Sequence, residues 1–183
     1  MAKNENAKGI QNRAVSSFER TVSRDSLVSH GSLIEDIRKE FRFIPGRVNT
    51  TIRVRPHIRD SQKSIISDIF GNGIVIDTQK KRHMTFTADH ILDESTTQDE
   101  VYDVVAKPII YDILHGYNGT ILAYGVSSSG KTYATMGELK DDYQFNTDPE
   151  KEGIIPRAIR EIFQFVKDHP QDEFKVELSF IQV

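Results

Sequence analysis

Apolar and polar residues alternate along several short segments of the chain. Residues 51–55, 73–77 and 84–88 are three such segments, and Pro56 ends the first one. The most regular alternation runs over residues 174–180. Because a period of two is typical of strands with one buried face, we expect strands at these four places.

Two longer segments carry apolar residues at helical spacing. In the first, Thr97 and Glu100 form a capping box, Pro108 predicts a kink or one lost hydrogen bond, and Gly116 is suited to end the helix. The apolar stripe of this helix is expected to be Val101, Val105, Ile109 and Ile113. The second helix is expected from Pro156 to before Pro170, with Ile155, Ile159, Ile162 and Val166 on one face.

Between these helices, a mostly apolar run over residues 120–124 leads directly into a glycine. A short apolar run of this kind predicts a buried central strand. We expect another helix after Lys131 and then a long polar loop over residues 138–152.

The first 47 residues differ from the rest in charge. They hold nine Lys or Arg and six Asp or Glu, a net of +3, whereas the remainder holds fifteen and twenty-one, a net of -6, which together give -3. Residues 1–29 have few large apolar side chains and predict disorder, and a capping box from Ser32 to Glu35 predicts a short helix. We therefore divide the chain into a disordered or weakly helical extension, 1–47, and a globular part, 48–183.

Composition excludes several classes of function. No stretch has the roughly 18 apolar residues that a membrane helix needs, and the polar start has no secretory signal. The chain has no cysteine, which excludes disulfides and Cys-ligated metals. A net charge of -3 predicts no general attraction to nucleic acid. The six histidines are scattered, so we expect no metal cage.

Residues 125–132 match the phosphate-loop pattern G-x-x-x-x-G-K-[ST] in full. The loop consists of Gly125, Val126, Ser127, Ser128, Ser129, Gly130, Lys131 and Thr132. An expected strand before it and an expected helix after it are the context in which this loop binds phosphate. Glycines let backbone N–H groups approach phosphate oxygens. Lys131 would neutralise β- and γ-phosphate charge, and Thr132 would ligate Mg²⁺.

The residues around this loop resemble the kinesin motor family, and most closely its conventional transport members. The resemblance rests on the segments 53–56, 96–107, 116–125, 128–132 and 153–157, and it covers roughly residues 49–183. It implies an α/β P-loop NTPase fold, a partial motor domain with a central mixed sheet flanked by helices. It also implies a microtubule-dependent ATPase that uses ATP or ADP with Mg²⁺, binds microtubules and lies on the cytoskeleton in the cytoplasm.

The resemblance further implies how the base of the nucleotide is held. Arg53, Arg55 and Pro56 match the family's R-x-R-P segment and would line the adenine side. Tyr133 would stack on the base, because its ring offers a flat apolar face. The chain departs from the family at Val126, where glutamine is common, and in the segment 86–92, where two aromatic positions hold other residues.

Hydrolysis needs groups that orient the attacking water and sense the γ-phosphate. In kinesins these belong to the segments N-x-x-S-S-R-S-H and D-L-A-G-S-E, and neither occurs in these 183 residues. We therefore expect a truncated motor domain that folds poorly or binds nucleotide weakly by itself, has unpaired strand edges and does not turn over ATP alone. A non-motile nucleotide- or partner-binding relative and an unrelated P-loop kinase are the alternatives.

Overall fold

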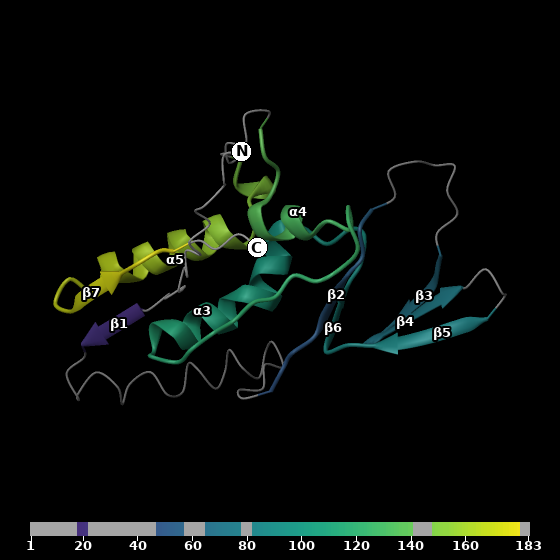
Figure 1. Cartoon of the computed structure of the whole chain (residues 1–183), viewed down its shortest axis with the longest axis horizontal. Helices are drawn as coiled ribbons and strands as arrows, with labels where there is room; N and C mark the ends of the chain where they lie inside the picture. The colour runs from purple at the N-terminus through teal and green to yellow at the C-terminus, as the bar shows by residue number, and fades with distance from the viewer. Residues whose placement is uncertain (1–17, 22–46, 57–64, 78–81, 141–147, 180–183) are drawn as a thin grey trace, which may run out of the picture.

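Helices lie in the middle of the molecule, with small sheets towards its two ends (Figure 1). This computed structural model describes residues 18–21, 47–56, 65–77, 82–140 and 148–179. The strands are β1 (Phe18–Thr21), β2 (Thr51–Arg53), β3 (Ile66–Phe70), β4 (Gly73–Asp77), β5 (His83–Thr87), β6 (His90–Leu92) and β7 (Glu173–Val176). The helices are α2 (Gln98–Val101), the π-helical turn η2 (Tyr102–Ala106), α3 (Lys107–Leu114), α4 (Lys131–Met136), the 3₁₀ turn η3 (Pro149–Lys151) and α5 (Ile154–Asp168).

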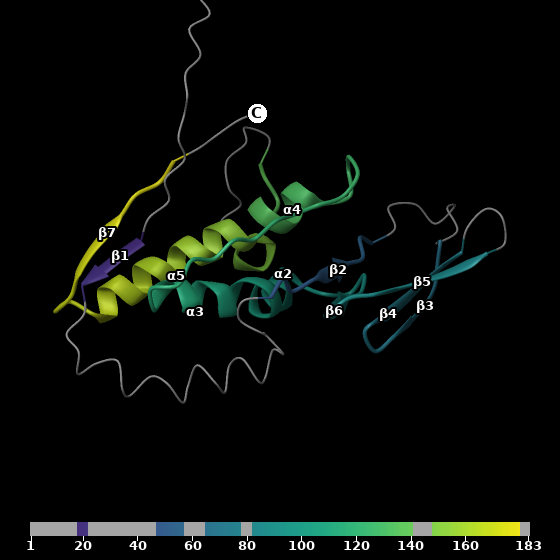
Figure 2. The same cartoon turned by 60° about the horizontal axis from the view of Figure 1, so that its bottom comes forward.

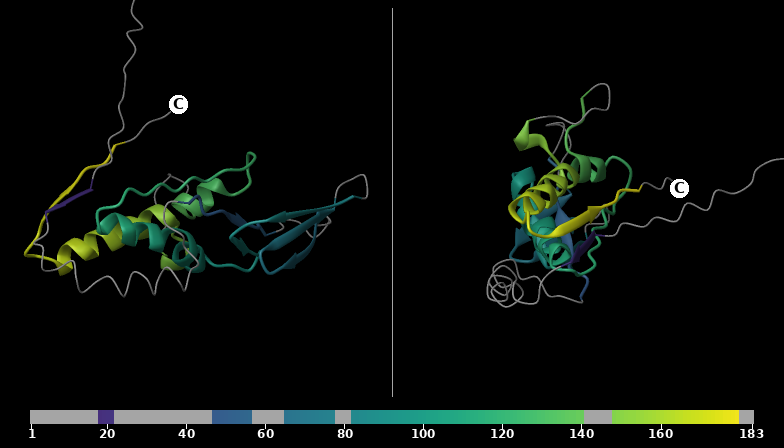
Figure 3. Two further views of the ribbon diagram at one scale, coloured as in Figure 1. Left: turned by 90° about the horizontal axis from the view of Figure 1, so that it is seen from below. Right: turned by 90° about the vertical axis from the view of Figure 1, so that its left-hand side faces the viewer.

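The described strands form three separate small sheets (Figures 2 and 3). β2 pairs in parallel with β6, β3, β4 and β5 form an antiparallel sheet, and β1 pairs antiparallel with β7. The fold is therefore α/β with mixed strand directions, as expected. Among the described residues, however, no single central sheet joins these strands.

Strand positions were predicted better than strand number. The strand at 73–77 is confirmed, the one at 51–55 is confirmed over its first three residues, and the one at 84–88 begins one residue earlier. β3 and β6 were not predicted. A register shift between Ile66 and Asp68 interrupts the alternation of β3, and β6 has only three residues, too few for a period to show.

The prediction of a buried central strand at residues 120–124 is wrong for the described structure. No described strand pairs with this run, and its side chains are largely open to solvent. Leu122 is 84% exposed and Tyr124 is 95% exposed, although Ile121 packs against the core. An apolar run becomes a buried strand only where neighbouring strands satisfy its backbone groups and cover its faces.

The long helical segment begins as predicted and then changes its pitch. The capping box is present, because the Thr97 hydroxyl accepts from the Glu100 N–H and the Glu100 carboxylate accepts from the Thr97 N–H at 2.7 Å. η2 follows, and the N–H of Lys107 donates to the carbonyl oxygen of Tyr102. Pro108, which has no N–H to donate, lies in the first turn of α3 immediately after this π turn.

The predicted apolar stripe of this helix is not the face that is most buried. Val101 is buried, but Val105, Ile109 and Ile113 are only half-buried. The buried face consists of Tyr102, Ala106, Ile110 and Leu114. Both sets have a spacing of four residues, so periodicity does not distinguish between them.

The ends of the helices follow local sequence signals. Gly116 adopts a φ of 91°, its N–H donates to the Ile113 carbonyl, and the Tyr117 N–H donates to that of Asp112, which is a Schellman cap. α5 begins two residues before Pro156 and ends at Asp168, so this helix is confirmed. The helix expected after Lys131 is confirmed as α4. Of the polar loop expected at 138–152, residues 141–147 lie outside the described part and η3 forms near its end.

Two segments far apart in the sequence, β1 and β7, pair in one sheet. β7 confirms the strand predicted at 174–180 over residues up to Val176, whereas residues 177–179 are not in a strand. β1 lies within the segment 1–29, so the prediction of disorder is wrong at its four residues. The helix expected after Ser32 lies outside the described residues, and the boundary at 47 stays a prediction.

A small core joins the helices to the segment before the phosphate loop. Val101, Tyr102, Ala106 and Ile154 form a buried cluster, against which Leu92 and Ile121 pack, among others. None of the helices in the described ranges is long and apolar enough to cross a membrane. The core thus joins α2, α5 and Ile121 beside the site described next.

Candidate functional site

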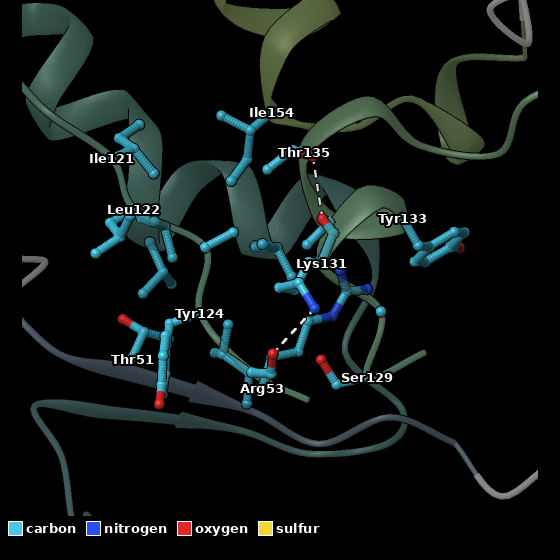
Figure 4. Close-up of a pocket in the computed structure, with 18 of the residues that line it drawn as sticks. Thr51, Arg53, Ile121, Leu122, Tyr124, Ser129, Lys131, Tyr133, Thr135 and Ile154 are labelled. Atoms are coloured by element: carbon cyan, nitrogen blue, oxygen red, sulfur yellow. Dashed lines mark hydrogen bonds between the residues drawn. The ribbon is translucent and has the colours of Figure 1, made fainter. Parts of the chain in front are cut away.

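A cavity of about 310 Å³ lies between β2, the run 120–125 and α4 (Figure 4). Most of the predicted site residues line it: Arg53, Arg55, Pro56, Gly125, Ser129, Gly130, Lys131 and Tyr133. Val126, Ser127, Ser128 and Thr132 belong to the same loop but do not line the cavity. The structure therefore brings together residues that are about 70 positions apart in the sequence.

The loop turns sharply into α4 at Gly130. This residue caps the helix with a φ of 100° and a ψ of 13°, in the left-handed region that glycine tolerates and other residues rarely adopt. Ser128 has a φ of 63°, which is uncommon for a residue with a side chain. Backbone strain of this kind gathers at ligand-binding loops, so the loop conformation agrees with the phosphate-binding pattern.

The ammonium group of Lys131 lies over the loop itself. Its Nζ donates to the carbonyl oxygen of Gly125 at 3.0 Å and to that of Val126 at 2.8 Å. Arg55 also contacts the loop, because its guanidinium donates to the carbonyl oxygen of Ser128. These two positive side chains give the loop end of the cavity a local positive charge in a chain whose net charge is negative.

Arg53 and Tyr133 lie against each other at the same end of the cavity (Figure 4). The guanidinium carbon of Arg53 is 5.3 Å from the centre of the Tyr133 ring, within the range of a cation–π contact. Burial lowers the pKa of the Arg53 guanidinium, and the nearby Tyr133 partly opposes this shift. Tyr133 is 44% exposed, so much of its surface can meet a ligand.

Gln98 joins these two residues, and the sequence analysis did not identify it as part of the site. Its Oε1 accepts from Arg53 Nη1 at 2.7 Å, and its Nε2 donates to the Tyr133 carbonyl oxygen at 2.7 Å. Gln98 is only 3% exposed. The capping box at Thr97 predicted that Gln98 lies in the first helical turn, but its two partners are 45 and 35 residues away and no sequence signal joins them. We call these three residues the Arg53–Gln98–Tyr133 cluster.

The other end of the cavity is apolar. Leu92, Val105, Ile109 and Leu122 line it together with Ile121, which Figure 4 shows on the side away from Tyr133. The cavity therefore has one positive, hydrogen-bonding end and one apolar end. Phosphate groups suit the first end, and the ring of a base suits the aromatic and guanidinium faces beside it.

The donor set allows a magnesium ion to bind with a nucleotide. Among the residues that the structure describes, no three His, Asp or Glu side chains gather in a way that could hold a metal by themselves. Thr132 is exposed and follows Lys131 at the start of α4. Because Mg²⁺ commonly takes few protein ligands and completes its shell with phosphate oxygens and water, one hydroxyl beside a phosphate loop fits such an ion.

Most of the chain is similar to known proteins. A family model described as the kinesin motor domain matches residues 53–183. The chain is 42% identical over 102 residues to kinesin-like protein KIF27 of Homo sapiens, covering 56% of this chain and 7% of that protein. It is 36% identical over 141 residues to kinesin-related protein 3 of Dictyostelium discoideum, covering 74% and 12%.

A solved structure is similar as well. The structure titled "Structure of a fast kinesin: Implications for ATPase mechanism and interactions with microtubules" matches with a TM-score of 0.57 and 32% sequence identity. The match covers 66% of this chain and 33% of that one. The chain thus spans only a small part of the curated relatives' length and a third of this structural relative.

Proposed function

Because this chain belongs to the kinesin motor family, we propose that it binds ATP with Mg²⁺ at the loop 125–132. In the complete protein, this site would serve ATP-driven movement along microtubules in the cytoplasm. The observation that carries the proposal is the cavity in which the phosphate loop and the Arg53–Gln98–Tyr133 cluster meet. A phosphate loop alone supports only phosphate binding, whereas the neighbouring ring and guanidinium add a place for a base.

Each residue of the site has a role in this proposal. Backbone N–H groups of the loop would donate to phosphate oxygens, and Lys131 would exchange its carbonyl partners for the β- and γ-phosphates. Arg55 would hold the loop in shape through the Ser128 carbonyl oxygen. Tyr133 would stack on the adenine ring, with Arg53 and Pro56 beside it.

Thr132 would hold the magnesium ion through its hydroxyl group. When bound, Mg²⁺ would neutralise part of the phosphate charge. We assign no further metal ligand to the described residues.

A binding titration tests the proposal. Lys131→Ala removes the ammonium group that would meet the phosphates, and we expect it to weaken the binding of fluorescent ATP by roughly 10- to 100-fold, the range for a lost hydrogen bond to a charged group. Lys167→Ala, which removes an exposed lysine of α5 remote from the cavity, is the matched control. Equal affinity in the Lys131 and Lys167 variants would contradict the proposed site.

Motor activity needs a separate test, because the two kinesin hydrolysis segments are absent from these 183 residues. The second candidate function is a chain that binds nucleotide without turnover. A microtubule-stimulated ATPase assay separates the two functions. A rate above that of Lys131→Ala supports turnover by the chain itself, and an equal rate together with ATP binding supports the non-motile alternative.

A further inference from the structure

We propose that Gln98 is a positioning residue that holds the base-binding surface of the nucleotide site in place. The inference rests on the proposed ATP function and assigns a role to a residue that would not itself touch the nucleotide. It follows from the two hydrogen bonds of one buried amide. One bond reaches the guanidinium of Arg53, and the other reaches the backbone of Tyr133.

The burial of Gln98 is the first argument. With 3% exposure, its amide has little access to water, so each polar atom needs a partner within the protein. The Oε1 has one in Arg53 and the Nε2 has one in the Tyr133 carbonyl oxygen, both at 2.7 Å. A glutamine whose donor and acceptor are both used within the protein has one favoured orientation. Its two hydrogen bonds therefore restrain the positions of both partners.

The partners of Gln98 are the second argument. Arg53 comes from β2 and Tyr133 from α4, so the amide bridges a strand and a helix that are far apart in the sequence. Arg53 also donates to the Thr96 carbonyl oxygen at 3.5 Å, a long contact that alone would leave the guanidinium loosely held. Gln98 therefore supplies the shorter bond that keeps Arg53 against the Tyr133 ring.

The position of Gln98 in the chain is the third argument. It directly follows Thr97, and the reciprocal bonds between Thr97 and Glu100 fix the first turn of α2. The same helix continues into the buried cluster of Val101, Tyr102 and Ala106. The side chain thus projects from an anchored backbone, as expected of a residue that positions others.

We expect the loss of the Gln98 hydrogen bonds to weaken the binding of a ligand that carries a base and to spare a ligand that lacks one. Tripolyphosphate would use the loop and Lys131 but not the Arg53–Gln98–Tyr133 cluster, whereas ATP would use both. We therefore expect Gln98→Met, which keeps the length of the side chain but removes both hydrogen bonds, to weaken ATP binding roughly tenfold. Binding of tripolyphosphate with Mg²⁺ should change less than about twofold, because the loop is untouched.

The experiment measures both ligands by calorimetry on the whole chain, alongside urea unfolding. Gln164→Met is the matched control, since Gln164 is an exposed glutamine of α5 that donates to Asp168 at 2.8 Å, away from the cavity. Should Gln98→Met fail to show the unfolding transition of the parent, Gln98→Glu decides the question. It retains an acceptor for Arg53 and loses the donor to Tyr133, so a smaller, roughly threefold selective loss of ATP affinity is expected.

An unchanged ratio of ATP to tripolyphosphate affinity in the variant that decides would overturn the inference. This holds if neither affinity changes, and also if both fall in parallel, as a purely structural role predicts. Failure of the proposed function would look different. In that case the unaltered chain would bind neither ligand, and the inference would fall with it.

Discussion

The two ends of the cavity are built in different ways. At one end, the Arg53–Gln98–Tyr133 cluster connects β2, α2 and α4 through short hydrogen bonds. At the other end, the run 120–124 contributes apolar side chains, yet no described strand pairs with it and Leu122 is 84% exposed. The polar end needs only a few directional hydrogen bonds, and the partners in these bonds are all described residues. A central strand requires neighbours on both sides and both faces covered.

The largest expected effect is on the free energy of unfolding, and it shows which side chains of the run 120–124 are packed in the fold. Ile121 packs against the buried cluster, whereas Leu122, its neighbour, is exposed. Because Ile121 is only half-buried, Ile121→Ala should lower the free energy of unfolding by roughly 1.5 kcal/mol, below the usual loss for a fully buried isoleucine.

Leu122→Ala is the matched partner of that variant and should change the free energy of unfolding by less than about 0.5 kcal/mol. Urea unfolding of the two variants measures the difference. Equal losses would mean that Leu122 is covered in solution, and the contrast between the two ends of the cavity would then disappear.

A second, intermediate effect concerns the capping box that anchors the cluster. Thr97→Ala removes the hydroxyl that accepts from the Glu100 N–H, and it should cost about 1 kcal/mol of stability. It should also reduce ATP affinity more than tripolyphosphate affinity, since Gln98 is the next residue.

Thr96→Ala is the control for the capping variant, because the Thr96 hydroxyl donates to Asp93 at a long 3.3 Å and takes no part in the capping box. Urea unfolding and the two-ligand titration provide the measurements. If Thr96→Ala and Thr97→Ala behaved alike, the anchoring role of the cap would be wrong.

The smallest effect concerns pH and the pairing of β2 with β6. The N–H and hydroxyl groups of Thr50 donate to the Asp89 carboxylate and lower its pKa below the usual value. The guanidinium of Arg47 lowers this pKa further, by a smaller amount. Because the folded pKa lies below the unfolded one, this carboxylate stabilises the fold above the unfolded pKa of about 4. The contribution is lost as the pH falls through the folded pKa.

Urea midpoints measured between about pH 5 and pH 2.5 test this linkage. The decline with falling pH should be shallower in Asp89→Asn than in the parent chain. Asp168→Asn, a change of an exposed carboxylate at the end of α5, should leave the slope closer to that of the parent. An unchanged slope in Asp89→Asn would contradict the role given to this group.

What the sequence predicted well depends on local chemistry. The capping box at Thr97, the cap at Gly116 and the helix after Lys131 each follow from a few neighbouring residues, and the structure confirms all three. The loop pattern likewise placed Gly130 correctly just before α4 and Lys131 at its start, although the functions of these residues remain predictions.

What the sequence did not predict depends on distant partners. Gln98 has no local signal for its bonds to Arg53 and Tyr133, which only the packing of β2 and α4 against α2 provides. The run 120–124 has the composition of a strand, but composition does not show whether neighbouring strands are present to pair with it. Similarly, the pairing of β1 with β7 joins residues about 155 positions apart, and no periodicity in the sequence indicates it.

The π turn of η2 has a consequence for insertions and deletions. A π turn holds about one residue more than an α turn, so it changes the angular phase of everything that follows by roughly 100°. Gln98 before the turn and Leu114 after it each face their present partners only with that extra residue in place. We expect deletion of one residue from η2 to put nucleotide site and helical core out of phase, so that only one of them keeps its contacts.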